Sequence, residues 1–129
     1  MISQLAEEIY IKSVQLKKYT SEMLLLKKNR LALKSEIIGL QSATSKLALE
    51  LRNNQNYSND YFELVLFMNK ILAECLVYST LRNKSNRETV KRYIWGFHNL
   101  PRAFFSLENP MKISPNEAME YYKPYLKSD

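Results

Sequence analysis

Residues 30–51 read RLALKSEIIGLQSATSKLALEL, and their apolar side chains recur at the alternating three- and four-residue spacing of a heptad repeat. The same register extends back to Ile2 without meeting a proline, and Gly39 is the one glycine within it. Twelve of the fifteen a and d positions are apolar. The a and d positions are Ile2, Leu5, Ile9, Lys12, Leu16, Tyr19, Met23, Leu26, Arg30, Leu33, Ile37, Leu40, Thr44, Leu47 and Leu51. The sequence therefore predicts a coiled-coil-like helical segment over residues 2–51.

The charges that flank this seam also suit helix pairing. Position g is often acidic, as at Glu22, and position e includes Lys27 and Lys34. Acidic g against basic e is the arrangement that pairs neighbouring helices. Two structures fit the pattern, and the first is slightly favoured. One is a continuous helix of about 75 Å that projects and forms a homodimer through its heptads. The other is a helical hairpin, broken near residues 27–30 or at Gly39, within one bundle.

The second part of the chain contains three further predicted helices. The polar stretch RNNQNYSND (52–60) separates it from the heptads, and an apolar helix is expected over about 60–82. A capping box at residues 85–88 predicts the next helix, which ends before Pro101. A second capping box, Ser114-Pro115-Asn116-Glu117, begins a last helix over about 115–123.

These elements predict an all-α protein. We expect a helical bundle with a long N-terminal coiled-coil-like helix, or helical hairpin, and three shorter C-terminal helices. Residues 1–52 form the coiled-coil-like arm and residues 53–129 the small bundle, and the two are expected to fold as one cooperative unit. Only two glycines and four prolines occur in 129 residues, which favours helix over sheet.

Composition narrows the possible partners. The net charge is +6 and the pI about 9.4, which suits an acidic protein, a nucleic acid or an anionic surface. The single Cys75 lies in an apolar run and is expected to be a buried hydrophobe. The most apolar window carries Glu63, Lys70 and Glu74 on one stripe, so no integral membrane segment is expected. No signal peptide is visible, and we expect a cytoplasmic protein without metal or cofactor.

Residues 90–105, VKRYIWGFHNLPRAFF, hold the only tryptophan and the only histidine. On a helix, one side of this stretch is apolar and should face the core. Its members are Val90, Tyr93, Ile94, Phe97 and Phe104. A different face forms a basic stripe that includes both unique side chains. The candidate partner-binding residues are Arg87, Lys91, Trp95, His98 and Arg102. Basic faces are often merely solvated, but a tryptophan within one is typical of a contact site.

The spacing Arg92-x5-His98 is similar to the R-x4–6-H pattern of the HEPN class of helical ribonucleases. The resemblance covers these seven residues. It implies a compact helical bundle that dimerises and cleaves RNA. His98 would then act as general acid or base, and Arg92 would bind the scissile phosphate.

Three functions follow from these features. The principal hypothesis is a non-enzymatic protein of the adaptor, regulator or immunity type, which binds another protein through the basic and aromatic helix face. The first alternative is a nucleic-acid-binding dimer that presents its basic stripes to phosphates. The second alternative is the HEPN-like ribonuclease that uses Arg92 and His98.

Overall fold

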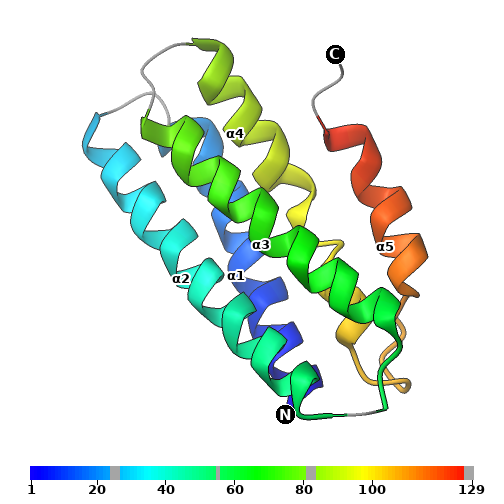
Figure 1. The fold of residues 1–129 in the computed structure, drawn as a ribbon. Coiled ribbons are helices and arrows are strands. Elements are labelled where there is room, and N and C mark those ends of the chain that lie inside the picture. Colours follow the sequence, from blue (N-terminus) through cyan, green and yellow to red (C-terminus); the bar gives the residue numbers. More distant parts are fainter. Residues whose placement is uncertain (24–26, 55, 81–83, 127–129) are drawn as a thin grey trace.

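The computed structural model describes residues 1–23, 27–54, 56–80 and 84–126. These residues form five α-helices, and no strand occurs among them (Figure 1). The helices are α1 (Ile2–Met23), α2 (Lys27–Arg52), α3 (Asn59–Thr80), α4 (Lys84–Phe97) and α5 (Pro115–Tyr122). Two short 3-10 helices, η1 (Pro101–Phe104) and η2 (Lys123–Tyr125), follow α4 and α5. The predicted all-α helical bundle is confirmed.

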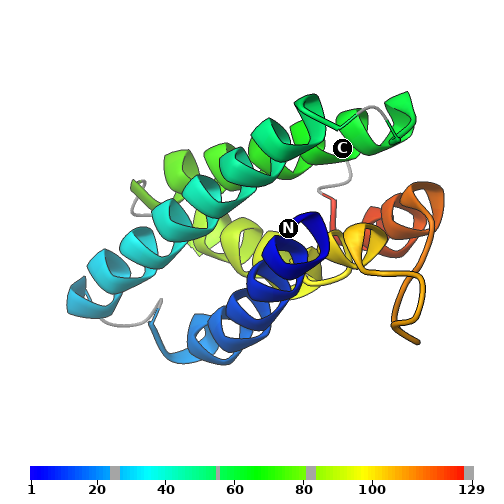
Figure 2. The same cartoon turned by 90° about the horizontal axis from the view of Figure 1, so that it is seen from below.

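The first four helices surround one core. Each packs against two neighbours, because α1 contacts α2 and α4, and α3 likewise contacts α2 and α4. Viewed from below, α2 and α3 form one layer and α1 and α4 the other (Figure 2). The last helix, α5, packs on α3 and α4. Buried residues from the heptad segment and from the later helices belong to a single hydrophobic cluster.

Of the two arrangements predicted for residues 2–51, the structure has the helical hairpin. Helices α1 and α2 run antiparallel side by side (Figure 1). The hairpin interpretation placed a break near residues 27–30 or at Gly39. Helix α2 begins at Lys27 and continues through Gly39, so a break at Gly39 is wrong. Residues 24–26 lie outside the described ranges. The heptad face of α2 is thereby buried inside the chain and not on a projecting arm.

The predicted seam is correct for α2 and shifted in α1. All six described a and d side chains of α2 are buried, namely Leu33, Ile37, Leu40, Thr44, Leu47 and Leu51. In α1 the predicted Lys12 is exposed, and Ser13 is buried in its place. The buried line of α1 is Ile2, Ala6, Ile9, Ser13, Leu16 and Thr20. The a positions Ile2, Ile9 and Leu16 remain in it, and at each d position the following residue, Ala6, Ser13 or Thr20, is buried.

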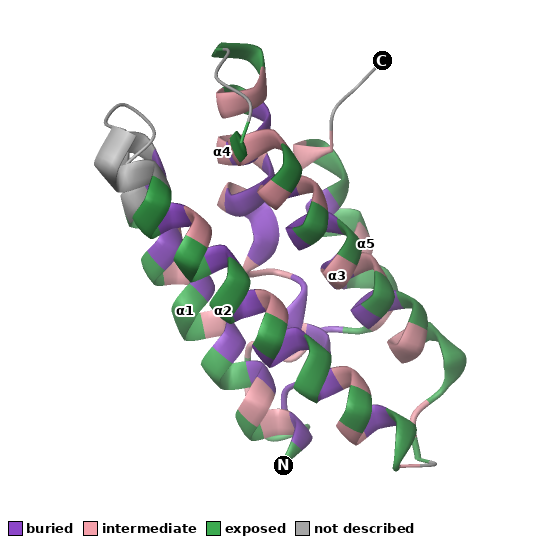
Figure 3. Cartoon of the chain, turned by 60° about the vertical axis from the view of Figure 1, so that its left-hand side comes forward, coloured by how far each residue is buried: buried purple, intermediate pink, exposed green. Residues whose placement is uncertain are grey.

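The C-terminal helices follow the predicted boundaries closely. The buried side of α3 includes Cys75, whose thiol is fully covered and whose pKa is raised by burial. All five apolar-stripe residues of the stretch after Thr89 are buried, as predicted. The capping box before α5 is confirmed, because Glu117 N donates to Ser114 Oγ at 3.1 Å and Ser114 N donates to Glu117 Oε1 at 3.2 Å. Figure 3 shows the buried faces turned inward throughout.

Candidate functional site

The five residues of the predicted basic stripe lie at the rim of the bundle. They are Arg87, Lys91, Trp95, His98 and Arg102, and each is half-buried. Lys91 lies beside the Trp95 ring, whereas His98 and Arg102 make contacts with other parts of the chain.

Two lysines approach the indole ring of Trp95. Lys91, one turn earlier on α4, places its Nζ 5.9 Å from the ring centroid. Lys17 of α1 places its Nζ closer, at 4.8 Å. Both distances are within the range of a cation–π interaction. Two ammonium groups that share one ring also repel each other, so their combined charge favours an anion nearby.

Lys17 is a member of this cluster that the sequence did not predict. It lies on α1, far along the chain from Trp95, and nothing in its heptad position distinguishes it from other lysines. Its place beside Trp95 depends on the packing of α1 against α4. Only the tertiary arrangement brings the two together, so no local signal could have found it.

A pocket opens beside Trp95 on α4. Its volume is about 240 Å³, and its lining residues are Glu88, Lys91, Arg92, Trp95 and Tyr125. Two aromatic rings and the aliphatic stems of Lys91 and Arg92 can contact an apolar group there. Lys91 and Arg92 line the pocket with Glu88, and Lys17 lies on the Trp95 ring, so three positive side chains accompany one carboxylate at the site.

Arg92 joins this pocket to the C-terminal segment. Its Nε donates to the backbone carbonyl of Tyr125 at 3.0 Å. Its Nη2 is buried and has no hydrogen-bond partner among the described residues. A buried donor without a partner destabilises the protein by about 1–3 kcal/mol, and a charged donor does so by more. An acceptor that reaches this nitrogen would recover that free energy.

Gly96 makes room for the ring that closes the pocket. Gly96 is buried, and a Cβ at this position would overlap the Tyr125 side chain. The close approach of Tyr125 to α4 therefore requires glycine here. The position of the Tyr125 ring in the pocket wall therefore depends on Gly96, which was not among the predicted site residues.

His98 leaves the stripe and packs against α1. Its ring meets Tyr10 edge-on with a centroid distance of 6.0 Å. Burial lowers the pKa of His98, and the charges of Lys17 and Arg102 lower it further, with a smaller opposing effect from the Trp95 backbone. Histidine is thus held toward its neutral form, although a helix C-terminus alone would favour the charged form.

Arg102 donates a hydrogen bond to the loop that follows η1. Its Nε donates to the Met111 carbonyl at 2.8 Å, and its Nη1 donates to Asn99 Oδ1 at 3.2 Å. Its guanidinium also lies 5.8 Å from the Tyr121 ring centroid. Much of its hydrogen-bonding capacity is therefore used within the chain, and it is placed as a structural residue.

Arg92 and His98, the two residues of the HEPN-like spacing, meet different neighbours. Arg92 binds the Tyr125 carbonyl, whereas His98 contacts Tyr10. Residues six apart lie about 120° from each other around a helix. The structure therefore does not bring the two side chains to one shared site within the chain.

Comparisons with known protein families, curated protein sequences and solved structures found no match. Within the described ranges, no group of three or more His, Cys, Asp or Glu side chains could hold a metal ion. None of the helices in those ranges combines the length and the apolar character needed to cross a membrane.

Proposed function

We propose that this protein is a non-enzymatic, cytoplasmic interaction protein of the adaptor or regulator kind, which binds an acidic segment of another protein at Trp95. The observation that carries the proposal is the pair of lysines, Lys17 and Lys91, on one half-buried indole beside a pocket of about 240 Å³. Tryptophan and arginine are the side chains that most often dominate binding free energy at protein interfaces.

The pocket suits a segment that carries both an apolar side chain and a carboxylate. An apolar group can lie against Trp95 and Tyr125. A neighbouring carboxylate can then accept hydrogen bonds from the lysines or from Arg92 Nη2, which lacks a partner in the described structure. Glu88, on the same rim, repels a dense run of negative charge. One or two acidic residues are therefore a better fit than a polyanion.

The competing function, phosphate-backbone binding, needs a row of free cations along one face. Three of the cations in this part of the chain are engaged with backbone carbonyls instead. Arg92 bonds to Tyr125, Arg102 to Met111 and Lys112 to Ala103. Lys17 and Lys91 lie at one aromatic ring, which favours a protein partner over a nucleic acid.

The unique tryptophan provides the test. Because the chain has one Trp, its fluorescence reports on this site alone. We would titrate the protein with a short Asp- and Glu-rich peptide containing one Phe, and separately with single-stranded oligonucleotide of equal charge. We expect the peptide to change the emission saturably. The affinity for the peptide should be about tenfold lower in the double variant Lys17→Met/Lys91→Met, which keeps the aliphatic stems but removes the charges.

Lys46→Met is the matched control, because Lys46 is an exposed lysine of α2 that does not line the pocket. It should bind the peptide as the wild type does. A response to the oligonucleotide alone would replace this proposal with the nucleic-acid alternative. A peptide response that Lys17→Met/Lys91→Met leaves unchanged would refute the assignment of the site.

A further inference from the structure

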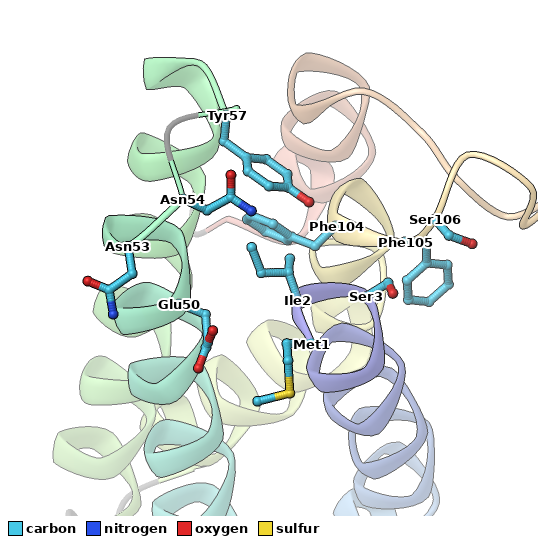
Figure 4. Close-up of a pocket in the computed structure, with 10 residues that line it drawn as sticks. All are labelled: Met1, Ile2, Ser3, Glu50, Asn53, Asn54, Tyr57, Phe104, Phe105 and Ser106. Atoms are coloured by element: carbon cyan, nitrogen blue, oxygen red, sulfur yellow. The ribbon is translucent and has the colours of Figure 1, made fainter.

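Away from Trp95, the described residues form an end pocket and an uncharged helix face. The pocket, of about 390 Å³, lies where α1 begins and α2 ends (Figure 4). Its apolar lining residues are almost fully covered, namely Ile2, Phe104 and Phe105. The Glu50 carboxylate points away from Asn54, so the groups that line the pocket do not converge on one ligand. The helix face, on the outer side of α2, is the surface from which an inference follows.

The outer face of α2 carries a second heptad line, separate from the buried one. Its members recur at spacings of four and three residues, and exposed positions are seen along α2 in Figure 3. All six are exposed, namely Leu31, Ser35, Ile38, Ser42, Ser45 and Leu49. At 3.6 residues per turn, this outer line lies about 160° around the helix from the buried line between Leu33 and Leu51. It therefore points away from the core of its own chain.

No member of the outer line is charged, whereas a helix face in solvent usually carries charged side chains. Helix α1 shows that usual composition, because its exposed residues include Glu7, Glu8, Lys12 and Lys18. On the outer line of α2, three large aliphatic side chains alternate with serines instead. Gly39 leaves the middle of the line open, since a Cβ built there would meet nothing within 4 Å. The outer line has the pattern of a helix face that packs against another helix.

The outer line is also complementary to itself when reversed. In an antiparallel pair centred on residue 40, each member meets its mirror position in the second copy. The pairs are Leu31 with Leu49, Ser35 with Ser45, and Ile38 with Ser42. Large side chains thus meet at both ends, and at the middle a large side chain meets a small one. A two-fold symmetric dimer requires such a self-complementary surface.

Charge favours a second copy at this face and favours antiparallel order. The chain has a net charge of +6, but residues 31–50 contain two lysines and two glutamates, so this part of α2 adds no net charge to an interface. Lys46 and Glu36 are both exposed and lie on the same flank of the outer line. Antiparallel order brings this flank against itself, with Lys46 within one turn of Glu36 of the second copy. Parallel order would bring it against the other flank, which carries Lys34.

We propose that two copies of this protein associate through the outer faces of their α2 helices, in antiparallel order, with Ile38 near the two-fold axis. This interface differs from the seam that predicted a homodimer, because that seam is buried within the chain. Trp95 belongs to α4, in the other layer of the bundle (Figure 2), so the dimer leaves both Trp95 sites uncovered. One helix from each copy makes a small interface, and we expect a dissociation constant of about 10–100 µM.

Sedimentation equilibrium of the full chain, from about 5 µM to about 1 mM, tests the association. The average mass should rise from one chain toward two across this range. Ile38→Lys places a charge in the interface twice, and should weaken the association at least about tenfold. Ile11→Lys is the matched control, because Ile11 of α1 and Ile38 are both 54% exposed and the added charge is the same. It should associate as the wild type does.

Two results of this experiment would overturn the proposal. A wild type that remains a single chain at about 1 mM would leave the outer face of α2 to a different protein. Equal weakening by Ile38→Lys and Ile11→Lys would mean that added charge, and not this face, controls the association. Circular dichroism of both variants checks that they remain as helical as the wild type.

Cross-linking tests the order of the two helices. Leu31→Cys and Leu49→Cys place thiols at opposite ends of the outer line, and the natural Cys75 is buried and should not react. A short bismaleimide should link the two variants to each other in a mixture, and should link neither variant to itself. Linking of Leu31→Cys to itself would mean parallel order and would overturn the proposed register. A wild-type dimer without any of these links would place the interface elsewhere and overturn the proposal.

Discussion

The α1–α2 hairpin and the chain after α4 are held in place by different kinds of interaction. The hairpin is held by aliphatic side chains at regular spacing, and its buried hydroxyls bond within their own helix. Ser13 donates to the Ile9 carbonyl and Thr44 to the Leu40 carbonyl, each four residues back. No group in these bonds depends on a distant part of the chain.

The region from His98 to Leu126 is held by long side chains that reach distant carbonyls. Arg102 and Lys112 each bond to a carbonyl nine residues away, and Arg92 to one thirty-three residues away. Irregular backbone leaves carbonyls that no helix satisfies, and charged donors are strong partners for them. The difference teaches that the basic composition serves two purposes. Part of it ties down irregular chain, and part surrounds Trp95.

The largest effect should come from removing the ring that anchors α5. Tyr122 is fully buried, packs edge-on against Phe67 at 5.6 Å and donates its hydroxyl to the Tyr93 carbonyl at 2.8 Å. Tyr122→Ala should lower the free energy of unfolding by about 3–5 kcal/mol. Urea denaturation followed by circular dichroism measures this. Tyr122→Phe, which keeps the ring, should cost only about 1 kcal/mol. A loss below that in Tyr122→Ala would mean that α5 is not part of the cooperative unit.

Replacing a cation that bonds within the chain should destabilise the protein more than replacing a solvated one. Arg102→Met keeps most of the aliphatic stem but removes the bonds to Met111 and Asn99, and should cost about 1.5–3 kcal/mol. Lys12→Met, at an exposed position of α1, should change stability by less than about 0.5 kcal/mol. Equal effects of the two substitutions in the same urea titration would contradict the division of the basic residues into two groups.

The same contrast explains how far the sequence could predict the structure. Heptad spacing predicted the buried line of α2, and the apolar stripe with Phe97 was correct, because both depend on periodicity within one helix. The basic stripe stays a prediction as a partner-binding surface. Helical position aligned His98 and Arg102 with Trp95, but it could not show that Tyr10 or the Met111 carbonyl would engage them.

The shift of the seam in α1 was not predicted either. In α1 the residue after each predicted d position is buried, so Ser13 lies in the core and Lys12 in solvent. Lys17 lies against Trp95 of α4. Neither the shift nor the new neighbour leaves a signal in the local sequence.

The two glycines should respond in opposite directions to the same change. Alanine at Gly39 meets nothing within 4 Å on the exposed side of α2, so Gly39→Ala should stabilise the protein by about 0.5–1 kcal/mol. Alanine at Gly96 overlaps the Tyr125 ring. Although alanine has a better helix propensity than glycine, Gly96→Ala should lower the free energy of unfolding by about 1–2 kcal/mol. Thermal unfolding of both variants measures the difference. Stabilisation by both would mean that Tyr125 does not pack on α4.

The smallest effect is a dependence of stability on pH that arises from His98. Burial first, and then Lys17 of α1 and Arg102 of η1, lower its pKa in the folded state, and Tyr10 is its aromatic neighbour. The unfolded chain, with a histidine pKa of about 6.5, therefore binds more protons than the folded chain as pH falls below that value. The contribution of neutral His98 to the free energy of unfolding should be fully present above about pH 6.5 and should decrease as the pH falls toward the folded-state pKa.

Urea midpoints at pH 7.5 and 5.5 provide the measurement, with His98→Gln as the comparison. Because His98 is the only histidine, and carboxylates of ordinary pKa are still ionised at about pH 5.5, the variant should lose most of the decrease. A decrease of equal size in His98→Gln would place its origin elsewhere. A rise in stability on acidification of the wild type would mean that His98 is stabilised in its charged form. It would then belong with the free cations around Trp95 and not with the residues that hold the irregular chain.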